Sequence, residues 1–527
     1  MYDLLIQNGT VVDGTGAPGF AADVAISGDR IVKVGNCAGE DAAHVIDAQG
    51  KIVAPGFVDV HNHSDAWLLK TPHLVSKTTQ GFTAEVIMAD GISYAPVSKG
   101  SIREWVTYLR GLNALRMEDY TGWESLADYM GELHGRNVQN SIPHVAYANV
   151  RALVCGFGRA KPDDTEMKAI QSEIAKGMDA GAVGLSTGLD YIVQCFASTD
   201  ELVAACAPLA EVQGLYVTHM RYKHGTMAAL REAVEIGKRA GIPVHISHLK
   251  GTSPAMIDEI MAYIDTVAVN EVDFSFDVYP YLPGSTMLNF YLPYAAWENG
   301  PLGVASAINR PEIMANFARA LEHTELGATH LAWTALADNK QWQGRFVNEY
   351  VAARGVPAAE ALADLLIEEQ LATLMVVNQG DNDLVLPFLA HDKYMMGTDG
   401  IYQPDGVIHP RQYGSAPRLL GWAVREKQIF SLESAVRKLS GYPAQRFGLT
   451  RRGELHAGWF ADVVVFDANT VADRATFTDP HQTSVGIEHV IVNGEAIIAD
   501  SAPLTELDAR RDAGNLPGRA LAFHQER

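Results

Sequence analysis

The chain has 527 residues, of which 47% are hydrophobic and 20% charged, the balance of a folded globular protein rather than a disordered one. Its formal net charge of −22 predicts a surface that repels nucleic acid and anionic membranes. The sequence contains no apolar run of the about 18–20 residues that a membrane-spanning helix needs, and its first residues lack the pattern of a signal peptide. The four cysteines have no CxxC spacing, which suits a reducing compartment. We therefore expect a cytoplasmic enzyme.

Short alternating strands and glycine-rich turns fill the first part of the chain, in stretches such as YDLLIQNG and DVAISGDRIVKVG. This texture is typical of a small antiparallel sheet. It returns near the C-terminus in GELHAGWFADVVVFD and IEHVIVNGEAII. We therefore predict one β-sandwich domain built from residues 1–55 and 450–500, with residues 501–527 as a tail that packs on the domains.

Between these ends, apolar strands alternate with stretches of helical character. The eight candidate strands are IVAPGFVDVHNH, FTAEVIMAD, PHVAYANV, GAVGLSTG, LYVTHMR, PVHISHLK, DFSFDVYPY and KYMMGTDG. Eight strands alternating with helices predict an α/β protein with a (β/α)8 TIM-like barrel over residues 56–449. Residues 282–392, approximately, separate the last two strands. An insertion of this size beside a barrel mouth is a candidate lid.

Histidines and aspartates stand at the carboxyl ends of these strands. The set comprises His61, His63, Asp90, His219, His248 and Asp399. Each alone has an ordinary explanation as a core histidine or a turn aspartate. A barrel, however, gathers its strand ends at one mouth, and imidazole and carboxylate are good zinc ligands. We therefore predict a site for one or two Zn2+ ions, or another divalent metal, that would lower the pKa of a bound water towards about 7.

These residues lie in motifs that resemble a known superfamily. VDVHNHSD after an IVAPGF run, with the sandwich split around a barrel, is similar to the amidohydrolase superfamily. Further stretches resemble its N-acyl-D-amino-acid deacylase (D-aminoacylase) branch: GLSTGLDY, VTHMR, ISHLK, FDVYPY, GTDG, HPRQYG and DPHQTSVGIEHVIVNGEAII. The resemblance implies a metal-dependent hydrolase that cleaves an N-acyl-D-amino acid to a carboxylate and a D-amino acid.

The resemblance also implies roles for the strand-end residues. His61 and His63 would be ligands of one metal position, and His219 and His248 of a second. Asp399 would contact the metal and act as the catalytic proton shuttle, accepting a proton from water and passing it to the leaving nitrogen.

Further residues would bind the substrate. Tyr279 is the candidate to donate a hydrogen bond to the developing oxyanion, with Tyr281 as its competitor. The resemblance places the α-carboxylate of the substrate against Tyr191, Lys250 and Arg411, because a guanidinium can donate two parallel hydrogen bonds to a carboxylate. The expected partner is thus a small molecule with a free carboxylate.

One position departs from the branch, which usually has cysteine in a GNCG turn after the second strand. This chain has MADG, so Asp90 stands where a thiolate is expected. Aspartate can ligate or bridge metals but is a harder ligand than thiolate. Two alternatives therefore stay open: the same chemistry on a cyclic amide, a lactone or a carbamoyl group, and an inactive amidohydrolase used as a scaffold. The retained histidines and Asp399 argue against the scaffold.

Three further questions are left open by the sequence. Arg221 could contact substrate or pair with a neighbouring carboxylate. Aromatic residues of the insertion could line the side-chain pocket or pack internally; they are Tyr291, Tyr294, Trp297 and Trp342. The oligomeric state is not indicated.

Overall fold

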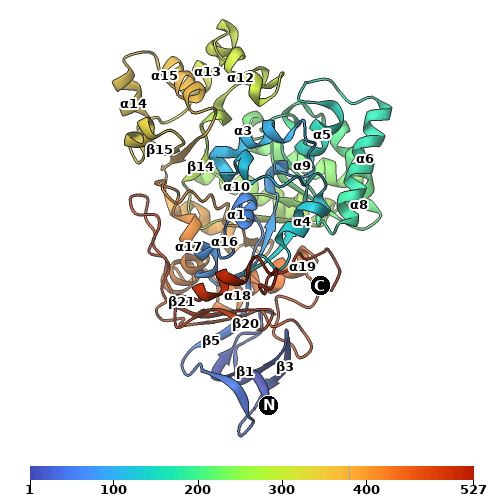
Figure 1. Ribbon diagram of the computed structural model, residues 1–527, viewed down its shortest axis with the longest axis vertical. Coiled ribbons are helices and arrows are strands. Elements are labelled where there is room, and N and C mark those ends of the chain that lie inside the picture. Colours follow the sequence, from blue (N-terminus) through green and yellow to red (C-terminus); the bar gives the residue numbers. More distant parts are fainter. Residues whose placement is uncertain (379, 527) are drawn as a thin grey trace.

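Both ends of the chain join in one nine-stranded sheet in the computed structural model, which describes residues 1–378 and 380–526. The strand order is β21-β20-β19-β18-β5-β1-β2-β3, with β4 also paired to β1. The strands are β1 (Tyr2–Val11), β2 (Phe20–Ser27), β3 (Arg30–Gly35), β4 (Ala42–Asp47), β5 (Ile52–Pro55), β18 (Val463–Phe466), β19 (Ile487–Val492), β20 (Glu495–Ala499) and β21 (Ala502–Pro503). In Figure 1 this domain lies at the bottom of the view. A β domain formed by both termini is thus confirmed.

The sequence predicted an antiparallel sheet, but two of the strand pairings are parallel. Strands β4 and β5 follow one another along β1 and run parallel to it, with Leu5 opposite Val45 and Thr10 opposite Ile52. The difference arises because β5 must leave the sheet towards the barrel, and this direction is the same as that of β1. The predicted strand IVAPGFVDVHNH is therefore two strands, β5 in the sheet and β6 in the barrel.

Parallel strands at eight positions form the barrel and confirm the predicted fold class. They are β6 (Phe57–Asp59), β7 (Phe82–Ile87), β8 (Asn140–Pro143) continued by β9 (Val145–Ala146), β10 (Gly184–Gly188), β11 (Leu215–His219), β12 (Val244–Ile246), β13 (Phe274–Val278) and β17 (Tyr394–Met396). Neighbours along the chain pair in this order, and a parallel bridge between Asn62 and Gly400 joins the first and last positions. The barrel strands are buried on both faces, which explains their continuous apolar character.

Helices follow the barrel strands and cover their outer side. They are α1 (Asp65–Lys70), α2 (Val75–Thr78), α3 (Ile102–Asn113), α4 (Leu126–Leu133), α5 (Tyr147–Cys155), α6 (Asp164–Asp179), α7 (Thr199–Ala205), α8 (Ala207–Ala210), α9 (Thr226–Ala240), α10 (Pro254–Tyr263), α11 (Val269–Glu271), α17 (Arg411–Arg418), α18 (Leu432–Leu439) and α19 (Gly441–Arg446). In α6, the Asp163 carboxylate caps the first turn and Ile170 and Ile174 are buried towards the barrel. Helix α5 begins at Tyr147, inside the stretch PHVAYANV that was predicted as strand.

The chain between β13 and β17 forms a separate layer, seen at the top of Figure 1. It contains an antiparallel sheet of β14 (Gly284–Met287), β16 (Thr373–Val377) and β15 (Thr329–Thr334). Its helices are α12 (Val304–Ala307), α13 (Pro311–Glu322), α14 (Val347–Arg354) and α15 (Ala358–Glu368). Helix α16 (Leu386–Ala390) lies lower in Figure 1 and packs on the barrel, where Phe388 contacts Phe276 of β13. The sequence indicated turns and helices here, but not this sheet.

The last residues run back to the barrel. Ala520 forms a parallel bridge with Ser141, and Leu521 and Phe523 join a buried cluster that contains Val58 and Val217 of the barrel. In residues 1–378 and 380–526, no helix combines the length and the apolarity needed to cross a membrane.

Candidate active site

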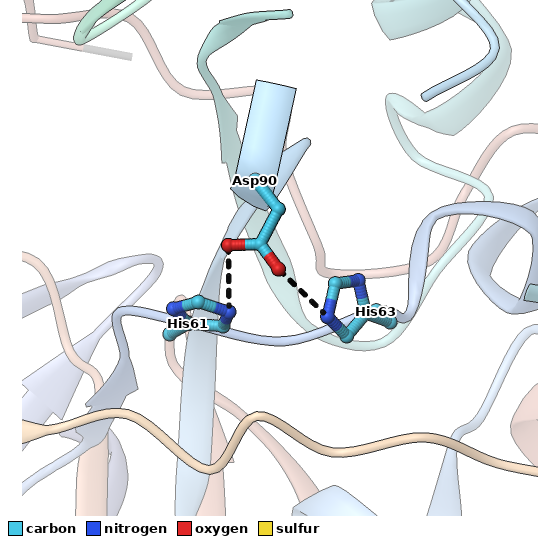
Figure 2. Close-up of side chains that lie close together, drawn as sticks. All are labelled: His61, His63 and Asp90. Carbon is cyan, nitrogen blue, oxygen red and sulfur yellow. Dashed lines mark ion pairs between the residues drawn. The ribbon is translucent and has the colours of Figure 1, made fainter. Parts of the chain in front are cut away.

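Five side chains from the carboxyl ends of the barrel strands meet in two groups of potential metal donors. We define the first donor group as His61, His63 and Asp90, and the second donor group as Asp90, His219 and His248; within each, the donor atoms lie within 4.8 Å of one another. Figure 2 shows the Asp90 carboxylate pointing towards both imidazoles of the first group, with Oδ1 3.6 Å from His61 Nε2 and Oδ2 3.7 Å from His63 Nε2. In the second group, Asp90 Oδ1 lies 3.8 Å from His248 Nε2 and Oδ2 lies 4.0 Å from His219 Nδ1. Asp90 is thus shared between the two groups.

Tight turns at the strand ends direct these side chains inwards. Asp90 lies in the 3-10 turn η1 (Ala89–Gly91), directly after β7, with φ of 59°. His248 and Asp399 also have positive φ, 37° and 47°. This left-handed backbone is costly for residues with a side chain and is found where the surrounding structure holds it in place, typically at functional sites. Gln194 contributes to this restraint because its Nε2 donates a hydrogen bond to the Asp90 carbonyl at 2.8 Å.

Asp399 completes the cluster on the side of the first donor group. Its Oδ1 lies 3.2 Å from His63 Nε2 and 3.7 Å from His61 Nε2, and its Oδ2 lies 2.8 Å from Arg411 Nη1. Burial opposes ionisation of this carboxyl, but the Arg411 guanidinium and the neighbouring histidines together outweigh burial and hold the pKa of Asp399 well below its usual range. Asp399 is therefore a carboxylate that can serve as a ligand or a proton acceptor.

A buried carboxylate, Asp277, supports the first donor group from within the barrel. Its Oδ2 lies 3.5 Å from His61 Nδ1 and 2.9 Å from His245 Nε2, and its Oδ1 accepts a hydrogen bond from the backbone N–H of His248 at 2.9 Å. This arrangement orients His61 so that Nε2 faces Asp90. Sequence reasoning missed Asp277, although it precedes Tyr279 by two residues and strand alternation places both on one face.

A second buried carboxylate, Asp190, supports the second donor group. Its Oδ2 lies 3.2 Å from His219 Nε2, which leaves Nδ1 of the same ring facing Asp90. Its Oδ1 accepts a hydrogen bond from the hydroxyl of Tyr294, a residue of the insertion, at 2.8 Å. Sequence reasoning missed Asp190 too; the signal was its place in GLSTGLDY, just beyond the end of the fourth barrel strand.

The donor set fits a divalent cation. His61 Nε2 and Asp90 Oδ1 are buried and have no hydrogen-bond partner within the part of the chain that the structure describes. Burial lowers the pKa of His61, but Asp277 and Asp90 outweigh it and raise this pKa to about 10. The local field therefore favours positive charge between these carboxylates. Imidazole nitrogen and carboxylate oxygen are the ligands that Zn2+ and similar ions accept.

A cavity of about 340 Å³ opens beside the two donor groups. Its lining includes His63, His219, His248 and Asp399 from the cluster. Of the predicted substrate-binding residues, Tyr191, Lys250 and Tyr279 also line it. Arg411 is not among the lining residues; its side chain is fully buried and pairs with Asp399.

Tyr279 connects the cluster to the predicted carboxylate-binding residues. Lys250 Nζ lies 2.5 Å from the Tyr279 hydroxyl, and the Arg411 guanidinium lies over the Tyr279 ring, 4.4 Å from its centroid. Burial lowers the pKa of Lys250 to about 7. The competitor Tyr281 is not a lining residue, and its hydroxyl lies 3.1 Å from Asp473 Oδ2. Of the two tyrosines, Tyr279 is the one that faces the cavity.

The structure also resolves the two questions of side-chain placement. Arg221 lies 3.2 Å from the Glu232 carboxylate and donates to the carbonyls of Leu189, Cys195 and Ala197, so it holds loops together. The four aromatic residues named in the insertion are absent from the described residues that line the cavity, whereas Phe290 is present. Trp297, for example, packs edge-on against Tyr108.

A barrel with polar donors at the carboxyl ends of its strands defines a class, the barrel hydrolases that carry a metal at this mouth. Residues 44–498 match the model of the Amidohydrolase family, and the chain belongs to that family. It is 34% identical to a D-aminoacylase of Alcaligenes xylosoxydans xylosoxydans over 95% of both chains. It is also 34% identical to an N-acyl-D-glutamate deacylase of the same organism, over 95% of this chain and 94% of that one.

A solved structure shows the same fold. The N-acyl-D-glutamate deacylase of Bordetella bronchiseptica, complexed with zinc and a phosphonate inhibitor that mimics the tetrahedral intermediate, superposes with a TM-score of 0.83 at 31% identity and 99% coverage of both chains. The predicted resemblance to the amidohydrolases, and to the D-aminoacylase branch within them, is thereby confirmed.

Proposed function

We propose that the protein is a metal-dependent hydrolase that cleaves the amide bond of N-acyl-D-amino acids to a carboxylate and a D-amino acid. The observation that carries this proposal is the convergence of the two donor groups and Asp399 beside a cavity lined by Tyr191, Lys250 and Tyr279. The similarity to D-aminoacylase and N-acyl-D-glutamate deacylase over nearly the whole chain supports it.

We assign the ligands from the geometry of the donors. Zn2+ or another divalent cation would be held by the first donor group, with Asp399 beside it, and a second cation by the second donor group. A bound cation would lower the pKa of a water molecule and polarise the scissile carbonyl. Each carboxylate oxygen of Asp90 faces one histidine of each donor group, so Asp90 would suit the shared position at which a thiolate was expected.

Asp399 is proposed to move the proton. It starts as a carboxylate because Arg411 stabilises its charge, and its Oδ1 faces the first donor group, where it can accept a proton from the attacking water. The protonated carboxyl is a strong acid in this setting, since Arg411 opposes protonation. It would therefore readily give the proton to the amide nitrogen as the C–N bond breaks.

The remaining groups are proposed to hold the substrate. The Tyr279 hydroxyl would donate a hydrogen bond to the developing oxyanion. Lys250 at the cavity wall, Arg411 behind it and Tyr191 would bind the α-carboxylate of the substrate, which places the scissile amide beside Asp399. The proposed partner is thus a small molecule with a free carboxylate, not nucleic acid or a membrane. We also propose a cytoplasmic location, supported by four free cysteines.

A paired substrate screen tests the function. The protein, loaded with Zn2+, is assayed with N-acetyl derivatives of the D and L forms of the same amino acids, and metal content is measured on the same preparation. Release of D-amino acids with at least about 100-fold preference over L forms supports the proposal. Hydrolysis of a hydantoin or a lactone in place of every N-acetyl-D-amino acid would contradict it and favour the same chemistry on another bond.

A further inference from the structure

The cavity wall beyond the donor groups is mainly apolar. It is formed by Leu112 of α3, Met256 of α10, Phe290 of the insertion, Val377 of β16 and Ile401 after β17. These residues come from both the barrel and the insertion. Hydroxyl side chains also line the cavity; they include Thr226, Thr252, Ser285 and Thr286. The wall therefore offers the substrate side chain mainly aliphatic, thioether and aromatic groups, together with neutral hydroxyls.

Positive charge is scarce in this cavity. Lys250 is the only lysine or arginine among the described residues that line it. Its ammonium group is within 2.5 Å of the Tyr279 hydroxyl, 3.0 Å of the Leu282 carbonyl and 3.5 Å of the Pro283 carbonyl. Lys250 is also the group proposed to bind the α-carboxylate of the substrate, so it is not available to a second carboxylate on the substrate side chain.

The other lysine and arginine side chains near the cavity contact groups of the protein itself. Arg411 pairs with Asp399, and Lys223 Nζ donates to the Phe290 carbonyl at 2.6 Å. Arg221 pairs with Glu232. The first segment of the insertion, residues 284–309, contains no lysine or arginine. Lys250 and Arg411 can serve one carboxylate at the cavity, and the described surroundings offer no second cationic pair.

We infer that the site selects N-acyl-D-amino acids with a neutral, apolar side chain and discriminates against D-glutamate and D-aspartate derivatives. This inference rests on the proposed function. A second carboxylate would lie against the mainly apolar wall without a lysine or arginine partner of its own, and burial of an unpaired charge is strongly unfavourable. Sequence identity does not distinguish between neutral and acidic substrate side chains, because the D-aminoacylase and the N-acyl-D-glutamate deacylase are each 34% identical to this chain.

Kinetics with four acetylated substrates test the inference on the Zn2+-loaded protein. We expect kcat/KM for N-acetyl-D-methionine and N-acetyl-D-leucine to exceed that for N-acetyl-D-glutamate at least about 100-fold. N-acetyl-D-glutamine has the shape of the glutamate substrate without its charge, and we expect an intermediate value. A glutamate value within about tenfold of the leucine value overturns the inference but leaves the proposed function intact. Hydrolysis of none of the four overturns both.

A charge added to the wall provides the second test. Met256 is half-buried in α10, and Met256→Arg is expected to narrow the leucine-to-glutamate ratio at least tenfold by supplying the missing cation. The matched control is Ala255→Arg, which adds the same charge at the exposed neighbouring position and should leave the ratio unchanged. Equal ratios in the two variants, with hydrolysis of the leucine substrate retained, would contradict the electrostatic basis of the selection.

Discussion

The two donor groups share Asp90 but are supported by different parts of the molecule. The first group is backed by Asp277, a barrel residue that is itself held by His245, also of the barrel. The second group is backed by Asp190, whose other oxygen accepts a hydrogen bond from Tyr294 of the insertion. The comparison teaches that the carboxylate behind His61 is held within the barrel, whereas the carboxylate behind His219 also depends on how the insertion docks.

The docking of the insertion also shapes the cavity. Lys223 donates to the Phe290 carbonyl and its ammonium lies 4.2 Å from the centroid of the Phe290 ring, while Tyr294 bonds Asp190. Phe290 is a residue of the cavity wall. The segment that completes the substrate-binding wall is thus the same one that reaches the second donor group.

The largest expected effect follows loss of the shared residue. Asp90→Ala should weaken metal binding by both groups and reduce kcat at least about 1,000-fold, which corresponds to about 4 kcal/mol of transition-state stabilisation. Mass spectrometry measures the metal content, and steady-state kinetics measures kcat. Asp90→Cys, which restores a metal-binding side chain, should recover part of the metal content. Loss of a single equivalent of metal in Asp90→Ala would show that Asp90 serves only one group.

Asp399→Asn should separate catalysis from metal binding. The amide cannot act as the proton acceptor, so we expect kcat to fall by about 10²–10⁴-fold, the range for loss of a general acid–base group. Metal content should stay close to that of the unaltered protein, because the two donor groups remain. Turnover at the normal rate in this variant would refute the proton-shuttle role.

The supporting carboxylates test the comparison directly. Asp277→Asn and Asp190→Asn each remove the charge behind one histidine, and loss of such a partner typically weakens metal affinity by about 10–100-fold. The affinity for each metal equivalent can be measured by competition with a chromogenic chelator. We expect Asp277→Asn to weaken metal binding by the first donor group and Asp190→Asn to weaken metal binding by the second. Equal weakening of both equivalents by both variants would mean that the groups are not supported independently.

The smallest effect tests the link to the insertion. Tyr294→Phe removes one hydrogen bond to Asp190, worth about 1 kcal/mol, and should weaken metal affinity of the second donor group by about fivefold. The control is Tyr291→Phe, in the same segment, whose hydroxyl is directed to Thr324. If both variants weaken metal binding alike, the effect comes from general disturbance of the segment rather than from the bond to Asp190.

Local sequence patterns determined the fold class and the position of the donors. Strand periodicity identified the barrel strands and the split β domain, because alternation and burial are properties of residues close together in the chain. The same alternation puts His61 and His63 on one face of the strand end. The sheet of the insertion was not predicted, because the pairing of β14, β15 and β16 joins segments that are far apart in sequence.

Only the tertiary structure decided which groups surround those donors. Tyr294 and Asp190 are 104 residues apart, and no local pattern predicts that they meet. Likewise, the structure pairs Arg411 with Asp399 and directs Tyr279, not Tyr281, to the cavity. The sequence by itself specified the faces of side chains within regular strands, through the periodicity of those strands, but not the directions of side chains in the turns that follow them. The partner that the side chain meets depends on the packing of separate elements, which becomes visible only in three dimensions.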